Sequence, residues 1–334
     1  MKKNILNLEK YELDQYVLKK YQGKEIFKWL YKKKEYDFLK YTNLSKELRN
    51  SLINIFEVKL LEIIKVEESS DVYKFLFKLK DSEYIETVLM KHGYGNSICV
   101  STQVGCNMGC LFCESGKLKK VRDLEVYELI SQILMVRDHL NIDINSVVLM
   151  GIGEPFDNYD NVVKFLKIIN DSDGLDIGAR KITVSTSGLV PMIDKFSDLG
   201  IQVNLAVSLH ASNNKTRSEL MPINKVYNLN MLMDSIRRYI DKTSRRVTIE
   251  YVMIKLVNDT LKDASDLVNL LKDLNVYVNL IPYNETSSNL EGSSDESIRK
   301  FYDILKKGGI DVTIRKKMGS KISAACGQLR SKEV

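Results

Sequence analysis

The spacing of hydrophobic residues changes along the chain and divides it into three predicted parts. In residues 1–60, apolar positions recur three and four apart in YELDQYVLKKYQG, KEIFKWLYKKK and KELRNSLINIF, a pattern typical of amphipathic helices. In residues 61–95, VYKFLFKLK and YIETVLM alternate and are rich in β-branched residues, which predicts a short β-hairpin linker. We therefore expect a small N-terminal helical domain that the hairpin joins to a larger domain.

From residue 96 to residue 334, strand-like and helix-like segments alternate. The predicted strands are SICVST, SVVLM, KITVST, VNLAVSL, RVTIEYVM and VYVNLIPY, with helical patterns such as VYELISQILMVRDHL and LKDASDLVNLLKDL between them. Repeated β-then-α units form parallel sheets with crossover helices. Six units are too few for a closed eight-stranded barrel, so we predict an α/β fold with an open, partial (β/α)6 barrel. A last helix, the strand DVTIR and a C-terminal extension follow.

Positive charge is concentrated in the predicted helical domain. Residues 1–50 contain 13 Lys and Arg against 7 Asp and Glu; the whole chain contains 50 against 44, which leaves 37 against 37 elsewhere. A basic accessory domain on a neutral body indicates a polyanionic partner, because Lys and Arg neutralise phosphates in nucleic-acid binding. Runs such as KKK at 32–34 are equally common on solvated helices, so charge alone leaves both interpretations open.

The sequence gives no sign of membrane insertion or export. It contains no run of eighteen apolar residues, and MKKNILNLEKYELD lacks the apolar core and cleavage site of a signal peptide. We therefore expect a cytoplasmic protein without membrane attachment. In that compartment its five cysteines are expected to be thiols, ligands or catalytic groups: Cys99, Cys106, Cys110, Cys113 and Cys326.

Three of these cysteines form a C-x3-C-x2-C motif directly after the first barrel strand: Cys106, Cys110 and Cys113. Three thiolates can hold three irons of a four-iron four-sulfur (4Fe-4S) cluster and leave the fourth iron open to a small molecule. Structural zinc requires four ligands, and none of the three histidines (His92, His139 and His210) lies close in sequence to the motif. The spacing and its position after a barrel strand favour the cluster over zinc.

The cysteine motif, with an aromatic residue before its last cysteine, resembles the signature of the radical S-adenosylmethionine (SAM) superfamily. Further segments resemble its RlmN and Cfr branch: KEIFKWLY, IETV, CVSTQVGC, LMGIGEPFDN, ITVSTSGLVP, VSLHASNNKTRSELMPIN, VNLIPYN and AACGQL. The resemblance runs nearly end to end. It implies an enzyme that methylates a ring carbon of an adenosine in 23S ribosomal RNA; whether transfer RNA is a second substrate is left open.

The resemblance also assigns residues to the SAM site. Those carried over are Gly153, Glu154, Ser185, Ser208, Leu209, His210 and Asn284, each near the end of a predicted strand, where barrel active sites form. From the residues alone, the glycines of GIGE would allow a ligand close to the backbone, and the carboxylate could accept a hydrogen bond from an amino group. Each polar residue taken singly would equally pass for a hydrogen-bonded buried group.

Three catalytic roles are implied only by the resemblance. Cys326 would be methylated by one SAM molecule, a second SAM would be reduced by the cluster, and the activated methyl group would pass to the RNA, so that each turnover uses two SAM molecules. Glu86 would accept the ring proton, and Cys99 would attack the sulfur of Cys326 to release the product. By themselves, Cys326 would be a buried or reactive thiol, Cys99 a core residue and Glu86 a surface carboxylate.

Basic residues precede Cys326 in the sequence: Arg315, Lys316, Lys317 and Lys321. They would hold RNA phosphates, or form a solvated basic loop. Implied partners are 23S ribosomal RNA, with transfer RNA open, and an electron donor such as flavodoxin or ferredoxin; the chain is expected to be a monomer.

Three other functions compete with methylation at the adenine C2 carbon. Cfr-type methylation at C8 is the nearest, and Pro155 after Gly153-Glu154 favours the RlmN branch and C2, whereas CESG at 113–116 matches neither branch closely. A radical enzyme that activates another protein would not explain the pairing of Cys99 with Cys326. A non-catalytic RNA-binding factor would not need a cluster.

Overall fold

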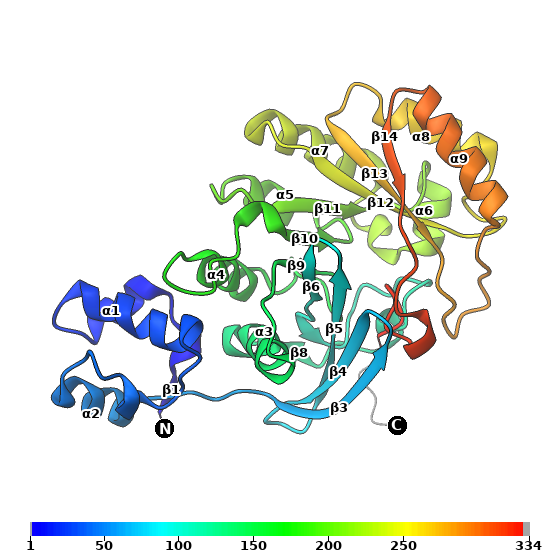
Figure 1. The fold of residues 1–334 in the computed structure, drawn as a ribbon. Helices are drawn as coiled ribbons and strands as arrows, with labels where there is room; N and C mark the ends of the chain where they lie inside the picture. Colours follow the sequence, from blue (N-terminus) through cyan, green and yellow to red (C-terminus); the bar gives the residue numbers. More distant parts are fainter. Residues whose placement is uncertain (1, 330–334) are drawn as a thin grey trace.

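A ten-stranded mixed sheet forms the centre of the molecule (Figure 1). This computed structural model describes residues 2–329, apart from the side chain of Lys321. Seven neighbouring strands are parallel: β6 (Gly95–Cys99), β9 (Ser146–Leu149), β10 (Ile182–Thr186), β11 (Asn204–Ser208), β12 (Val247–Met253), β13 (Val276–Pro282) and β14 (Asp311–Ile314). The first six coincide with the predicted strands, which confirms the partial (β/α)6 barrel, and β14 is the strand expected after the last helix.

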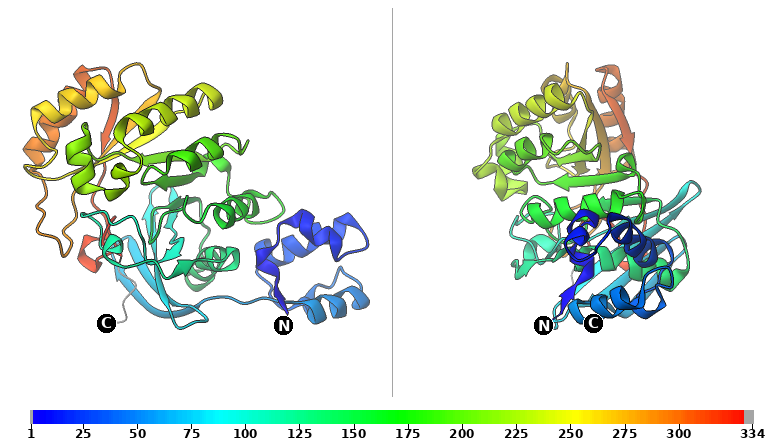
Figure 2. Two further views of the ribbon diagram at one scale, coloured as in Figure 1. Left: turned by 180° about the vertical axis from the view of Figure 1, so that it is seen from behind. Right: turned by 90° about the vertical axis from the view of Figure 1, so that its left-hand side faces the viewer.

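Helices surround the curved parallel part of the sheet (Figures 1 and 2). They are α3 (Val126–Leu140), α4 (Tyr159–Asn170), α5 (Val190–Ser197), α6 (Asn214–Leu220), α7 (Leu229–Thr243), α8 (Leu261–Leu271) and α9 (Asp295–Lys307). The strands are short apolar runs because helices and barrel interior cover both faces, and Val147, Val184 and Leu205 are fully buried. Polar residues are left at the carboxyl ends of the strands, where the site forms.

The strands predicted as a linker hairpin are part of the same sheet. β5 (Tyr84–His92), β4 (Val72–Lys78) and β3 (Glu62–Ser69) extend it beyond β6 as antiparallel strands. β5 pairs with β6 so that Val88 lies opposite Cys99. Local alternation predicted the strands, but not that the two-residue turn between β5 and β6 joins them to the parallel sheet, because β6 pairs with the distant β9. One face of β5 therefore becomes a wall of the candidate site.

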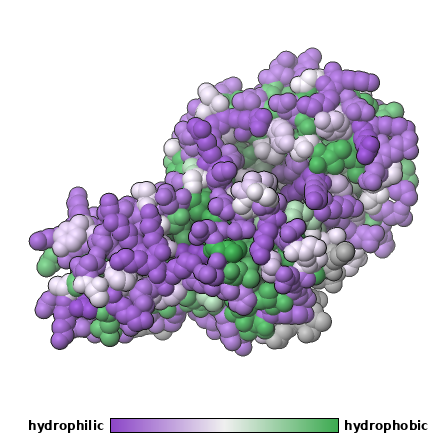
Figure 3. Space-filling model, in the orientation of Figure 1, coloured by the Kyte–Doolittle hydropathy of each residue, from purple (hydrophilic) through white to green (hydrophobic). Residues whose placement is uncertain are grey.

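The N-terminal segment is helical, as predicted, although its helices are short. Its elements are β1 (Lys3–Asn4), η1 (Ile5–Asn7), η2 (Lys10–Gln15), α1 (Lys20–Phe27), the π-helical η3 (Lys28–Lys32), η4 (Phe38–Lys40), α2 (Lys46–Ile55) and β2 (Phe56–Glu57). The segment stands beside α3 and α4, and its visible surface is mostly hydrophilic (Figures 2 and 3). Lys10 Nζ lies 2.8 Å from Asp171 Oδ1, and Lys164 Nζ lies 2.7 Å from Glu12 Oε2. Its independence as a domain stays a prediction.

The chain after β14 crosses to the antiparallel edge of the sheet, as the red segment in Figure 1 shows. It includes η8 (Ser320–Ile322). Ala324 and Leu329 pack with Val72, Val88 and Ile152 in a small apolar cluster. This packing brings Cys326 beside β5 and β6. None of the helices within residues 2–329 is both long and apolar enough to span a bilayer.

Candidate active site

The three motif cysteines lie on a loop with a closed base. The loop leaves from β7 (Gln103–Val104) and returns at β8 (Arg122–Asp123), and these strands pair antiparallel. Within the loop, Cys113 N donates to Cys110 O at 3.2 Å. Leu111 N donates a hydrogen bond to Leu220 O at 3.0 Å, which fixes the loop against α6. We call residues 105–121 the cluster loop.

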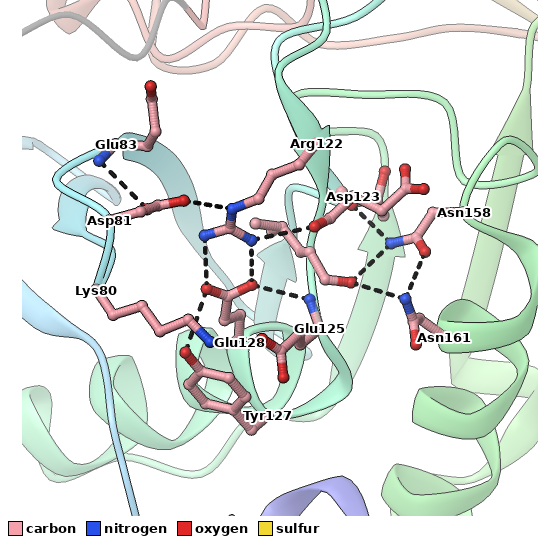
Figure 4. Close-up of polar contacts among 12 residues, drawn as sticks. Lys80, Asp81, Glu83, Arg122, Asp123, Glu125, Tyr127, Glu128, Asn158 and Asn161 are labelled. Atoms are coloured by element: carbon pink, nitrogen blue, oxygen red, sulfur yellow. Dashed lines mark hydrogen bonds and ion pairs between the residues drawn. The ribbon is translucent and has the colours of Figure 1, made fainter.

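Arg122 anchors the base of the cluster loop (Figure 4). Its guanidinium donates to both carboxylate oxygens of the buried Glu128, at 2.7 and 2.9 Å, and to Asp81 at 2.5 Å. Beside it, Asn158 Nδ2 donates to the carbonyls of Thr102 and Leu124, both at 2.9 Å. Paired Arg–carboxylate contacts fix orientation as well as distance, so the loop leaves the sheet from a rigid base.

A first cavity opens between the cluster loop and the strand ends; we call it the cofactor cavity. It has a volume of about 920 Å³ with its open mouth included, and all three motif cysteines line it. The strand ends contribute Gly153, Glu154, Ser185, Ser208, His210, Glu250 and Asn284. Within residues 2–329 no three His, Cys, Asp or Glu side chains form a site for a single metal ion. On a four-iron cluster each cysteine would bind a different iron, so the three-thiol set fits such a cluster.

Glu154 is the buried carboxylate of the cofactor cavity. Its Oε2 accepts from Ser187 N at 2.7 Å and its Oε1 from Phe156 N at 3.0 Å, and burial raises its pKa. The preceding residue, Gly153, has φ +105°. Only glycine fits at this position, because a Cβ would lie 2.6 Å from Gln103 Cβ. Packing against Gln103 within the chain therefore requires this glycine. The sequence suggested a different reason, the close approach of a ligand to the backbone.

His210 enters the cavity as a neutral imidazole. Burial and the nearby Arg217 lower its pKa to about 3. Its Nδ1 accepts from Val252 N at 3.1 Å, which assigns the proton to Nε2. The ring meets Phe112 of the cluster loop edge to face, with centroids 4.6 Å apart. His210 therefore offers the cavity a donor without a charge.

A second cavity, of about 1380 Å³ with its open mouth included, adjoins the C-terminal segment; we call it the basic cavity. Its lining comes from β5 and β6 (Val88, Met90, His92, Tyr94 and Cys99) and from the chain after β14 (Arg315, Lys316, Lys317, Cys326 and Leu329). Arg315, Lys316 and Lys317 are its charged lining residues, whereas those of the cofactor cavity are Glu154 and Glu250. Met150, Ile281, Asn284, Cys326 and Gly327 line both cavities, so the two meet at Cys326.

Hydrogen bonds to three carbonyls hold the Cys326 segment. Asn284 Nδ2 donates to Cys326 O at 3.2 Å, Glu114 N to Gly327 O at 2.8 Å, and Ser115 Oγ to Leu329 O at 2.8 Å. Two of these donors belong to the cluster loop, so the loop positions Cys326 directly. Asn284 Oδ1 is buried without a hydrogen-bond partner within the described residues and lines both cavities, which suits a polar ligand there.

Cys99 and Cys326 are free thiols that both face the basic cavity. Cys326 is exposed to the two cavities, and its desolvation by the surrounding protein raises its pKa. Burial raises the pKa of Cys99 to about 12, and the neighbouring Cys326 adds to the effect. Arg315 opposes the shift at both thiols. Both cysteines are therefore protonated near neutral pH, with one shared cation close by.

Known proteins resemble this chain over almost its full length. The profile of the Radical SAM superfamily matches residues 100–271, and that of the Ribosomal RNA large subunit methyltransferase N-terminal domain matches residues 3–58. A protein of Spiroplasma citri is 51% identical, over 94% of this chain and 92% of its own length, and one of Enterococcus faecalis is 50% identical, over 100% and 97%. Both are named "Probable dual-specificity RNA methyltransferase RlmN". The chain belongs to the RlmN family of radical SAM proteins.

The fold agrees with this family membership. The crystal structure of a radical SAM methyltransferase from Sphaerobacter thermophilus superposes with a TM-score of 0.91 at 39% identity, covering 98% of this chain and 99% of that one. Membership of the radical SAM superfamily implies that this RlmN-family protein uses SAM and an iron–sulfur cluster. Cfr-type identity finds no support in the relatives named above.

Two residues expected at the site do not line either cavity. Leu209 is a fully buried core residue between Ser208 and His210. Glu86 is buried on β5, where Lys74 Nζ lies 3.4 Å from Oε1. Glu86 shares a strand face with Val88 of the basic cavity, because β-strand side chains alternate. Its role as proton acceptor stays a prediction, and the side chain of Lys321, expected to contact phosphates, lies outside the described structure.

Sequence reasoning missed two charged residues that shape this RlmN-family site. Glu250 is buried on β12, lines the cofactor cavity and accepts from Asn279 Nδ2 at 2.8 Å. Arg217 is fully buried, and it donates to Ser187 O at 2.8 Å and to Ser208 O at 3.2 Å, which ties the ends of β10 and β11 together. The sequence did contain a signal for Glu250, a single carboxylate inside the apolar run TIEYVM. Burying an unpaired charge is costly, so a carboxylate in a buried strand indicates a functional position.

Proposed function

We propose that this chain methylates the C2 carbon of an adenosine in 23S ribosomal RNA, and that it also accepts transfer RNA, using a 4Fe-4S cluster and two SAM molecules per turnover. The observation that carries the proposal is the position of Cys326 between two cavities of opposite charge. The relatives' name, dual-specificity RNA methyltransferase, supports RNA as the substrate.

The cofactor cavity suits a ligand that carries positive charge. SAM has a cationic sulfonium centre and an ammonium group, and the charged lining residues are the carboxylates of Glu154 and Glu250. Neutral His210 adds no repulsion. Cys106, Cys110 and Cys113 would hold the cluster. When bound, the cluster and SAM supply radical hydrogen abstraction, which is needed because an adenine ring carbon is not a nucleophile.

Cys326 is the residue placed to carry a methyl group from one cavity to the other. Its thiol faces the cofactor cavity, where it can accept the group, and the basic cavity, where RNA can approach. The hydrogen bonds from Asn284, Glu114 and Ser115 fix the backbone from Cys326 to Leu329. The sulfur can therefore change its partner without a large movement of the chain.

Cys99 is placed to complete the cycle. Once the carbon on the Cys326 sulfur is joined to the RNA, that sulfur–carbon bond must break, and attack by a second thiol gives a disulfide and frees the product. Cys99 lies in the same cavity as Cys326, close enough for Cys326 to raise the pKa of Cys99. Arg315 faces both thiols and would favour the attacking thiolate.

We propose C2 and not C8 as the methylated carbon because Pro155, the RlmN-like residue, lines the cofactor cavity beside Glu154. We also propose that a flavodoxin or ferredoxin reduces the cluster and that the protein is a cytoplasmic monomer. Exposed Leu111 and Val121 flank the exposed Lys117 and Lys119 on the cluster loop, a surface suited to an acidic electron carrier.

The decisive experiment is methylation in vitro with anaerobically purified protein. It should contain about four irons per chain and transfer methyl groups from SAM to transcribed 23S ribosomal RNA and to transfer RNA. Digestion and mass spectrometry against C2- and C8-methyladenosine standards identify the product. C8-methyladenosine would reassign the carbon. Stoichiometric zinc without iron, or no methylated RNA from cluster-loaded protein, would reject the proposal.

A further inference from the structure

The rim of the basic cavity carries a pair of stacked rings that the proposed chemistry does not use. Tyr94 lies in the two-residue turn between β5 and β6, and its ring stacks on His92 with centroids 4.7 Å apart and planes 5° apart. Both residues line the basic cavity, yet Tyr94 is 79% exposed. A ring so exposed adds little to folding, because apolar stabilisation scales with the area buried.

The turn that carries Tyr94 is held in a fixed position. Asn96 N donates to Asn145 Oδ1 at 2.7 Å, and Asn96 Nδ2 donates to Asp143 O at 2.8 Å. On the other strand, Lys91 N donates to Asp71 O at 2.7 Å. Gly95, with φ +129°, allows this close packing, since a Cβ there would lie 2.5 Å from Asn145 Oδ1. The backbone on both sides of the ring pair is thus held in place, and the stacked rings form a flat surface at the cavity edge.

Cations line the same cavity as this surface. They are Arg315, Lys316 and Lys317, three consecutive residues after β14. An aromatic face beside a row of cations is the arrangement by which proteins bind single-stranded RNA: bases stack on the ring, and Lys and Arg hold the backbone. Other exposed tyrosines, such as Tyr11 and Tyr21, are not in the lining of either cavity.

We propose that Tyr94, backed by His92, is a stacking platform for the base of an RNA nucleotide next to the target adenosine, and that Arg315, Lys316 and Lys317 hold the intervening phosphates. This inference rests on the proposed function. The target adenine must reach Cys326 at the junction of the cavities, so its neighbour in the chain lies toward the rim where Tyr94 stands. The platform would select RNA in which the adenosine and its neighbour are unpaired, because a paired base cannot leave its stack without cost.

The test compares Tyr94→Ala with Tyr94→Phe, which keeps the ring, and with Leu261→Ala, which trims another exposed apolar residue on the remote α8. The probe is a single-stranded RNA with 2-aminopurine on either side of a central adenosine. Because stacking on an aromatic ring is worth roughly 1–3 kcal/mol per base, Tyr94→Ala should weaken RNA binding about 5- to 150-fold. Tyr94→Phe and Leu261→Ala should bind RNA as the unchanged protein does.

Fluorescence of the 2-aminopurine reports the stack itself. It should be quenched by the unchanged protein and by Tyr94→Phe, and should stay bright with Tyr94→Ala. Equal quenching and equal affinity with Tyr94→Ala would overturn the platform. Methylation of Cys326 by SAM without RNA, read as added mass on the intact protein, should be the same in all four proteins, and its loss in Tyr94→Ala would point to misfolding. Failure of the unchanged protein to methylate RNA would count against the proposed function alone, since the binding readouts need no turnover.

Discussion

The two cavities share Cys326 but differ in almost every other property. The cofactor cavity is built from the carboxyl ends of parallel strands, its charged lining residues are carboxylates, and the cluster loop covers it. The basic cavity adds an antiparallel extension and the C-terminal segment to a few residues of the parallel strands, and its charged lining residues are cations. Most of the first lies within the residues that the Radical SAM profile matches, and nearly all of the second lies outside them. Under the proposed function, this difference assigns cofactor chemistry to the barrel and RNA recognition to its additions.

The largest expected effect comes from the two cysteines of the basic cavity. Cys326→Ala removes the only thiol that faces both cavities among the described residues, so neither protein methylation nor an RNA adduct should form. Cys99→Ala should still be methylated at Cys326 and should then stall with RNA attached. Denaturing gels before and after nuclease treatment measure the adduct. A Cys99→Ala enzyme that turns over at the normal rate would make Cys99 a plain core residue.

The cofactor cavity could be predicted from the sequence much more fully than the basic cavity. Six strands followed from periodicity, and cavity residues such as Cys106, Glu154 and Asn284 are near strand ends, where barrel topology fixes their location. The basic cavity depends on the hairpin of β5 and β6 joining the parallel sheet through β9, and on the C-terminal segment crossing to β3. Both are contacts between distant parts of the chain that no local pattern encodes. Its platform residue Tyr94 therefore passed unnoticed in the sequence.

Removing negative charge from the cofactor cavity should weaken SAM binding and leave RNA binding unchanged. Glu154→Gln keeps the shape of the side chain but removes the charge and one acceptor. A hydrogen bond to a charged group contributes about 1.5–3 kcal/mol, so SAM affinity should fall roughly 10- to 150-fold. Equilibrium binding of SAM to cluster-loaded protein measures this, with the exposed Glu291→Gln as the matched control. An equal loss of RNA affinity would show that the cavities are not separate in function.

Removing positive charge from the basic cavity should have the opposite pattern. Lys316→Ala should lower RNA affinity, and the slope of log affinity against log salt should fall by about one, because one phosphate contact is lost. SAM binding should not change. The control is Lys262→Ala on the outer helix α8, where the lysine pairs only locally with Asp266 at 2.6 Å. If both variants change the slope alike, RNA binds to the overall charge of the protein and not to the basic cavity.

The smallest expected effect lies in the N-terminal helices, whose excess charge first indicated a polyanion. The structure separates the three lysines of KKK at 32–34: Lys33 Nζ lies 3.5 Å from the centre of the Trp29 ring, Lys34 Nζ lies 4.0 Å from Asp138, and Lys32 is exposed. Lys32→Ala should therefore flatten the salt dependence of RNA binding by at most about one. Lys34→Ala should instead lower the melting temperature slightly, since exposed ion pairs contribute about 0–1 kcal/mol. Salt titrations of RNA binding and thermal melts separate the two effects. A salt slope that Lys32→Ala leaves unchanged would mean that this domain only packs against α3 and α4. RNA recognition would then be confined to the basic cavity.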